Sequence, residues 1–318
     1  MDDLGESIEK WDKQIKDLKA ENEKLKKLLN KDEINVQYKD RLFKFIFGHP
    51  DNKQWTLELY NAVNGTDYKD TEELQFNTIG EALYLKMKND ISFIIHFEMN
   101  LWEHQSTFNP NMPMRFLRYV SSLYEKFIAT TGYYEYSSTL QEIPTPKCVC
   151  FYNGTQEQPE KQILSLSDAY EGEGDVEVKV TMLNINYGKN KKLMEACKPL
   201  QEYAWLVDTV RKHQQEKMDL DAAIDVAVDE MPEDFAIHEF IIANRAEVKT
   251  MLLTEYNEEK VMEMERQEGE RKGQKEVAGL MNYLLSNGRN DDALKASTDE
   301  TFLNKLLADF RGGLMVAK

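Results

Sequence analysis

The chain opens with a seven-residue repeat whose positions are apolar except for one asparagine. Spacings of four and three residues separate its members, Leu4, Ile8, Trp11, Ile15, Leu18, Asn22, Leu25 and Leu29. This repeat predicts the a/d seam of a coiled coil, and Asn22 falls at an a position, where a buried amide favours a parallel dimer in register. We therefore expect residues 1–32 to form a coiled-coil helix that makes a homodimer through residues 4–29. The alternative is a single amphipathic helix packed on its own domain.

Two helix patterns follow from about residue 35. Phe43, Ile46 and Phe47 form one apolar face in "NVQYKDRLFKFIFG", and "GHPDN" ends that helix. The second helix is expected in "KQWTLELYNAVNG", where Asn64 and Gly65 close it.

The apolar period then changes to that of β-strands. Four stretches rich in Ile, Phe, Tyr and Val predict strands: "LQFNTIG", "ALYLKMKNDISFII", "MNLWEHQS" and "PKCVCFYNG". A helical pattern, "PMRFLRYVSSLYEKFIAT", separates the last two, which predicts a strand–helix–strand crossover within a mixed sheet. "VEVKVTMLNINYG" is either a further strand or a buried extended arm.

From about residue 190 the pattern is helical to the end of the sequence. The stretch "EYNEEKVMEMERQEGERKGQKE" is highly charged and has no apolar stripe, which is typical of a solvated linker helix. We expect an α/β protein with four parts: the coiled-coil helix 1–32, a sheet-containing domain 35–210, a helical extension 211–270 and a small helical tail 271–318.

The composition limits the classes of protein. A length of 318 residues and a hydrophobic content of 41% are enough for a large core, and the net charge of -17 argues against a generally basic nucleic-acid binder. Any affinity for DNA must then come from a local patch. Three cysteines do not make a disulfide framework. We expect no signal peptide and no membrane span, and hence a soluble cytoplasmic protein.

The candidate chemistry gathers at the ends of two expected strands. Asp90 begins "ISFII", and Glu103 and Gln105 end the next strand on one face, since side chains alternate with a period of two. A hairpin turning near 96–98 brings Asp90 and Glu103 together, where two carboxylates can hold one Mg²⁺. His104 points to the other face, which favours a structural role over that of a general base. Gln105 can orient an attacking water molecule.

The residues just named carry a resemblance to a known family. "YKDRLFKFIF", Asp90, "EHQS" and "PMRFLRY" together resemble the recombination-promoting nuclease / putative transposase family of the PD-(D/E)XK nuclease superfamily, over residues 36–154. The resemblance implies a restriction-endonuclease-like mixed sheet flanked by helices, a Mg²⁺-dependent endonuclease acting on double-stranded DNA, and a role in promoting recombination. Asp90 and Glu103 match the metal-binding acids, with Mn²⁺ as a possible substitute ion. Gln105 matches a position that many members fill with lysine.

Four further residues are candidates for supporting roles. Asp40 matches the acid of a D-x-x-F-K helix and either helps the metal site or caps the helix, while Lys44 either pairs with Asp40 or touches a phosphate. Arg115 and Tyr119 stand one helical turn apart, and Arg115 either clamps a phosphate or braces Glu103.

Two questions stay open on the sequence alone. Glu98 and Asn100 repeat the acid-x-amide pattern in the same hairpin, so the metal pair could be misassigned. The second question is activity. The alternative to an endonuclease is a catalytically decayed nuclease-fold interaction protein that dimerises through its coiled coil, which the missing lysine and the acidic charge favour.

Overall fold

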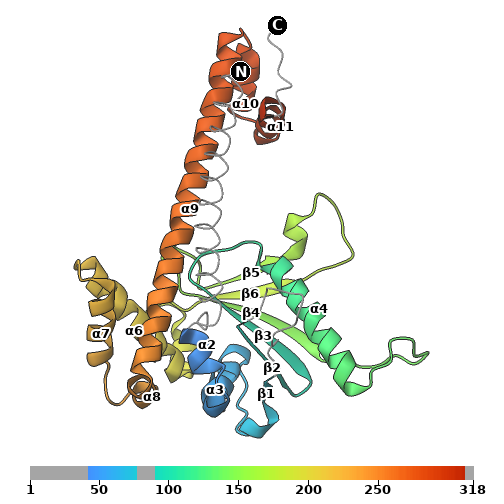
Figure 1. The fold of residues 1–318 in the computed structure, drawn as a ribbon. Coiled ribbons are helices and arrows are strands. Elements are labelled where there is room, and N and C mark those ends of the chain that lie inside the picture. Colours follow the sequence, from blue (N-terminus) through green and yellow to red (C-terminus); the bar gives the residue numbers. More distant parts are fainter. Residues whose placement is uncertain (1–41, 77–89, 312–318) are drawn as a thin grey trace, which may run out of the picture. The chain divides into compact units, whose positions relative to one another are not determined.

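The computed structural model describes residues 42–76 and 90–311 (Figure 1). The expected coiled coil 1–32 with its dimer seam at 4–29, and the candidate residue Asp40, lie outside these ranges. The protein is of the mixed α/β class, and it forms two compact units, residues 1–256 and 257–318. Within the described ranges, each helix is too short or too polar to cross a lipid bilayer.

A six-stranded mixed sheet forms the centre of the first unit. Its order is β1-β2-β3-β4-β6-β5. The strands are β1 (Gln75–Phe76), β2 (Ile91–Ile95), β3 (Glu98–Gln105), β4 (Thr145–Tyr152), β5 (Lys161–Ser165) and β6 (Lys179–Asn184). The strands β3, β4 and β6 run parallel to one another, whereas β1 and β2 pair antiparallel on one side and β5 on the other. The predicted crossover from β3 through a helix to β4 is confirmed.

The hairpin between β2 and β3 turns over two residues only. His96 and Phe97 both have positive φ, 48° and 62°, which is the backbone of a type I′ turn. Glycine and asparagine usually fill such positions, so this turn holds two bulky residues in a conformation that costs each about 1–2 kcal/mol. The buried pairs of the two strands outweigh that cost, because Ile91, Phe93 and Trp102 are fully buried.

Helices cover both faces of the sheet (Figure 1). On one face lies α4 (Met112–Thr131), whose Phe116, Tyr119 and Leu123 pack against Leu101 and other residues of the sheet. The other face packs against α2 (Leu42–Phe47), α3 (Lys53–Asn64), α5 (Lys191–Ala196) and α6 (Lys198–Gln215). Because side chains alternate along β3, neighbouring residues such as Leu101 and Trp102 enter two separate cores. Burying a side chain such as Leu101 contributes about 1.5–3 kcal/mol.

The first unit continues through α7 (Leu220–Asp229) and α8 (His238–Ala243) into α9 (Arg245–Ser286). An ion-pair ladder joins α7 to the start of α9, where Lys249 contacts Asp221 and Asp225 at 2.7 and 2.6 Å. In the second unit the end of α9 packs with α10 (Asn290–Ala296) and α11 (Glu300–Arg311) around Leu280, Leu284 and Leu306. The charged linker sequence is helical, as expected.

Three features differ from the sequence-based expectation. The edge strand β5 was not expected, because its five residues, "KQILS", are too few to show a period. The helix expected from residue 190 is broken at Cys197, whose backbone is extended. A new helix, α6, begins at the next residue with Pro199 in its first turn, where proline is well tolerated. A similar break at Asn244 separates α8 from α9.

Candidate functional site

Asp90 and Glu103 face each other across the hairpin. Ile91 pairs with Trp102 in the antiparallel register, and one step further this register sets Asp90 opposite Glu103. The Asp90 carboxylate accepts a hydrogen bond from the backbone N–H of His104 at 2.8 Å, which fixes its side chain beside β3. Directly opposed residues have Cβ atoms about 4.5–5.5 Å apart. The register therefore places Asp90 and Glu103 side by side on neighbouring strands, and the convergence of their carboxylates on one ion stays a prediction.

Arg115 forms an ion pair with Glu103. Its Nη2 lies 3.1 Å from Glu103 Oε2, with the glutamate side chain only 2% exposed and the arginine side chain 30% exposed. The Tyr119 hydroxyl accepts from Arg115 Nη2 at 2.9 Å and from Nε at 3.3 Å, and so holds the guanidinium against the sheet. Of the two roles left open for Arg115, this contact matches the one in which Arg115 braces Glu103. The exposed part of the guanidinium still faces solvent.

Burial and neighbouring charges shift the pKa values of Arg115 and Tyr119. Burial opposes the charge of the Arg115 guanidinium, but Glu103, Tyr119 and Asp90 together outweigh it and raise the pKa of Arg115 above its usual value. Burial, and then the negative charge of Glu103, raise the pKa of Tyr119 to about 12. Arg115 therefore stays charged and Tyr119 stays neutral at any physiological pH.

Gln105 lies on the same face as Glu103, as the strand period predicts. Its Nε2 donates to the backbone carbonyl of His104 at 2.9 Å and contacts Glu103 Oε2 at 3.4 Å. The side chain is 5% exposed, so the amide is held at the strand end with little freedom. A neutral amide in this position can hydrogen-bond a water molecule but brings no positive charge.

His104 points into the opposite core. It stacks on Phe43 of α2 with ring centroids 5.2 Å apart, and its Nε2 lies 2.9 Å from the hydroxyl of Tyr203 on α6. Asn153 donates to the same hydroxyl at 3.1 Å. His104 therefore lies on the face opposite Glu103 and Gln105, and its packing contacts fit the structural role expected for it. Nothing in the sequence pattern marked Tyr203 or Asn153, which join this network through tertiary packing alone.

The second acid-x-amide pattern lies at the far end of the hairpin. Glu98 pairs with Ile95 next to the turn, whereas Asp90 lies beyond the other end of β2. The Glu98 carboxylate accepts from the Tyr60 hydroxyl at 2.8 Å and pairs with Lys147 at 3.5 Å. Glu98 and Asn100 therefore cannot form the carboxylate pair with Asp90.

The loops that follow β3 and β4 pack closely beside the site. A Cβ atom added to Gly154 would lie 2.0 Å from the backbone oxygen of Ser106, so only glycine fits there. The backbone N–H of Asn153 also donates to the carbonyl of Gln105 at 3.1 Å. This packing fixes the chain just after Gln105.

The donor set of the site suits a hard cation. Mg²⁺ prefers oxygen ligands and is commonly held by one or two carboxylates together with waters and a substrate phosphate. Asp90 and Glu103 provide two such carboxylates on rigid neighbouring strands, so the residues fit that ion. No cluster of three or more His, Cys, Asp and Glu side chains able to bind a metal occurs among the described residues.

The other candidates contribute less to this geometry. Lys44 lies half-buried on α2, on the opposite face of the sheet from Glu103. Cys148, Cys150 and Cys197, all within the described ranges, form no disulfide, and burial raises the pKa of both Cys148 and Cys197 to about 12, so these two are inert thiols.

Comparison with known proteins gives no relative. No protein-family model, no curated protein and no solved structure matches this chain.

Proposed function

We propose that this chain is a Mg²⁺-dependent endonuclease that hydrolyses phosphodiester bonds in double-stranded DNA, on a restriction-endonuclease-like sheet. The observation that carries the proposal is the position of Asp90 one register step beyond the Ile91–Trp102 pair, opposite Glu103, with the amide of Gln105 against the same glutamate. The resemblance of "EHQS" and "PMRFLRY" to the recombination-promoting nucleases supports the same reading and suggests a role in DNA rearrangement.

Asp90 and Glu103 would hold the ion, and a bound Mg²⁺ would supply Lewis-acid polarisation of the phosphate. Gln105 orients the attacking water by hydrogen bonding, because its amide is fixed at the strand end. Arg115 supplies the positive charge that Gln105 lacks. Its guanidinium is held by Tyr119 and is partly exposed, so it can stabilise negative charge that develops on the phosphate.

The proposed assembly is a dimer, formed through the heptad repeat at 4–29. Each copy carries one candidate site, so a dimer would place two sites on one duplex and cut both strands.

Cleavage of supercoiled plasmid tests the proposed function. The wild-type chain should nick or linearise the plasmid only when Mg²⁺ or Mn²⁺ is present, and Asp90→Ala or Glu103→Ala should abolish the reaction. Glu98→Ala is the matched control, since it removes an acid from the same hairpin at the end away from Asp90. Full cleavage by the Asp90 and Glu103 variants would refute the proposal.

A second candidate function is supported by one specific observation. Arg115 already neutralises Glu103, and a stable internal ion pair is what a site without a metal would keep. The chain would then be a decayed nuclease-fold interaction protein that dimerises through its coiled coil. Calorimetric titration with Mn²⁺ separates the two candidates: binding that Glu103→Gln removes supports the nuclease, and no binding at millimolar Mn²⁺ supports the decayed protein.

A further inference from the structure

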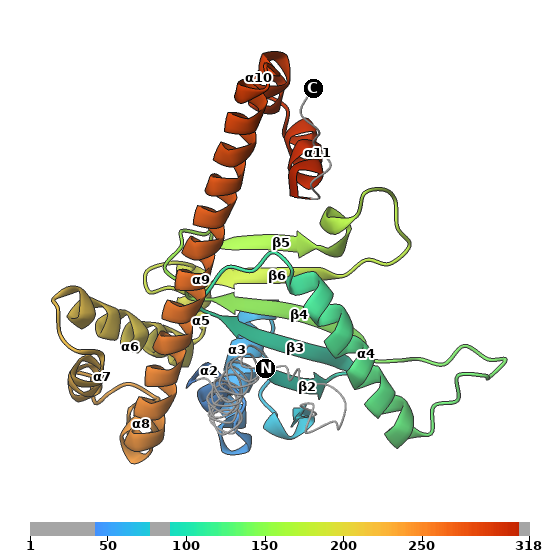
Figure 2. The ribbon, with the colours of Figure 1, turned by 45° about the horizontal axis from the view of Figure 1, so that its top comes forward.

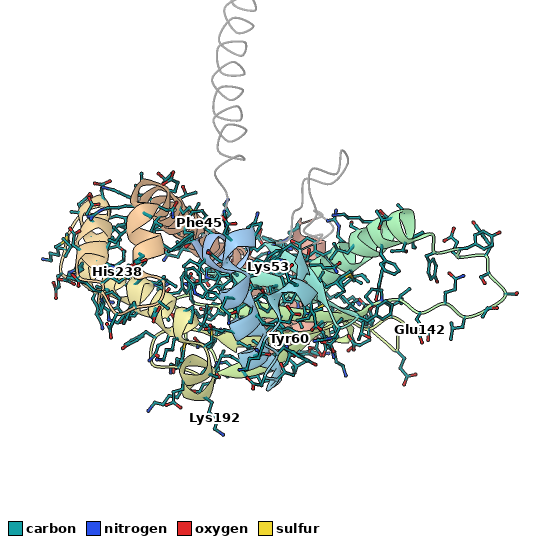
Figure 3. The ribbon with its side chains drawn as sticks, turned by 90° about the horizontal axis from the view of Figure 1, so that it is seen from below. Phe45, Lys53, Tyr60, Glu142, Lys192 and His238 are labelled. Carbon is teal, nitrogen blue, oxygen red and sulfur yellow. The ribbon has the colours of Figure 1, made fainter. Side chains whose placement is uncertain are left out.

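A lysine-rich turn follows β6 at the end of the sheet that carries the site. Residues 186–192, "NYGKNKK", are named the basic turn here. Lys189, Lys191 and Lys192 are all exposed, and no carboxylate of residues 42–76 or 90–311 forms an ion pair with them. In Figure 3 the side chain of Lys192 points away from the rest of its unit. Three exposed lysines within four residues stand out in a chain of net charge -17.

The register of the sheet shows where this turn begins relative to the site. Gln105 pairs with Tyr152, and Tyr152 pairs with Asn184, so the three residues form one row across the parallel strands β3, β4 and β6 (Figure 2). Two inter-strand spacings of about 4.8 Å place Asn184 about 10 Å from Gln105. The basic turn begins two residues after Asn184. It therefore lies at the carboxyl ends of the parallel strands, the same end of the sheet as the site and the end where ligands of open α/β sheets bind.

Side-chain amides hold the basic turn in place. Asn186 Nδ2 donates to the carbonyl of Gly154 at 3.0 Å, and Asn186 Oδ1 accepts from Arg211 Nη1 at 2.9 Å. Asn190 donates its backbone N–H to Glu160 Oε1 at 3.0 Å and its side-chain N–H to the carbonyl of Asn184 at 2.8 Å. Gly154 in turn packs on the loop that follows Gln105. A continuous set of contacts thus links the lysines to the site.

The nature of the ligand follows from charge and spacing. Exposed lysines on an ordered turn contact phosphates as point charges, and such contacts supply affinity without reading sequence. Successive nucleotides of one DNA strand rise about 3.4 Å, so a turn that begins about 10 Å from Gln105 would contact phosphates about three or more nucleotides from the bond that is cut. The exposed ring of Tyr187, with Lys212 Nζ 5.8 Å from its centroid, adds a flat apolar surface to the same turn.

We propose that the basic turn binds the DNA backbone beside the bond that is cut, so that Lys189, Lys191 and Lys192 direct the duplex into the Asp90–Glu103 site. This inference rests on the proposed nuclease function. It also accounts for how an acidic chain can bind DNA, because it places three lysines at the end of the sheet that carries the site.

Fluorescence anisotropy with a labelled DNA duplex tests the proposal on the full-length chain. The duplex is titrated in Ca²⁺ at several salt concentrations, with Lys189, Lys191 and Lys192 changed together to alanine. We expect the affinity to fall on the order of 10- to 100-fold at about 0.1 M salt, and the slope of log K against log salt to lose about 2.7 if each lysine releases one counterion. DNA should also protect these three lysines from acetylation in the wild-type chain.

The matched control is a second triple variant with the same loss of charge. Its three lysines are Lys126, Lys147 and Lys179, which lie toward the other end of the same sheet. Lys147 is the third residue of β4, Lys179 is the first of β6, and Lys126 precedes Phe127, whose ring contacts Phe97 in the hairpin turn. Changing these three to alanine should leave DNA affinity near wild type.

Four results would count against the inference. Unchanged binding by the basic-turn variant, when the wild type binds and cuts DNA, overturns this inference alone. Equal losses in both triple variants would mean a general charge effect and overturn it too. Acetylation of the basic turn that DNA does not slow has the same consequence. A wild-type chain that binds no duplex at all overturns the proposed function as well.

Discussion

The ion pair between Arg115 and Glu103 gives the most quantitative prediction. At a charge separation of about 4 Å, an effective dielectric constant of 20 gives a gross attraction of about 4 kcal/mol. Removing one partner of a fully buried pair costs about 3–5 kcal/mol, and exposed pairs contribute about 0.2–1 kcal/mol. Glu103 is 2% exposed and Arg115 30% exposed, so we expect Arg115→Met to lower the free energy of unfolding by about 2–3 kcal/mol.

Urea unfolding followed by tryptophan fluorescence measures the unfolding of the first unit, which contains Arg115, because all four tryptophans fall within residues 1–256. Arg118→Met is the matched control: it removes the same group from an exposed position one turn along α4 and should change stability by less than about 0.5 kcal/mol.

A double-mutant cycle with Glu103→Gln then isolates the pair. The double variant should lose at least about 1 kcal/mol less than the sum of the two single losses. Strict additivity, or an Arg115→Met chain as stable as wild type, would refute the argument that the pair is buried and coupled.

Three further predictions follow from packing and titration. Gly154→Ala should lower stability by about 1–3 kcal/mol, measured by urea unfolding, because its Cβ would overlap the Ser106 carbonyl. Trp102→Ala should cost about 3–5 kcal/mol in the same assay, since the indole is fully buried. Burial and the charge of Glu103 raise the folded-state pKa of Tyr119 to about 12, above its unfolded value. Its contribution to stability is therefore complete below about pH 10 and lost as pH rises toward 12; Tyr119→Phe should show a smaller fall in unfolding free energy between these pH values.

The hairpin could be read from the sequence because its signals are local. Strand periodicity set Glu103 and Gln105 on one face, and the short spacing from Asp90 left room only for a tight turn. The turn itself, His96-Phe97, carries no Asn-Gly signature, so its geometry follows from the pairing of the strands around it and not from its own residues.

The partners of the site could not be read in the same way. The sequence left Arg115 between a phosphate contact and a brace on Glu103, because the choice depends on how α4 docks on the sheet. The strand β5 is too short for a period, and Tyr203 reaches His104 across 99 positions of sequence. The basic turn could not be assigned a role from the sequence, because "NYGKNKK" is an ordinary turn sequence. Only the parallel register shows that it lies at the same end of the sheet as Gln105.

The most direct test of the central claim is to locate a metal ion in the site. Crystals of the chain soaked in Mn²⁺ and measured at the manganese absorption edge should show one anomalous peak between the carboxylates of Asp90 and Glu103, with the Arg115 guanidinium moved off Glu103. An anomalous peak at Glu98 instead, or an intact Arg115–Glu103 pair with no peak beside it at millimolar Mn²⁺, would contradict the account.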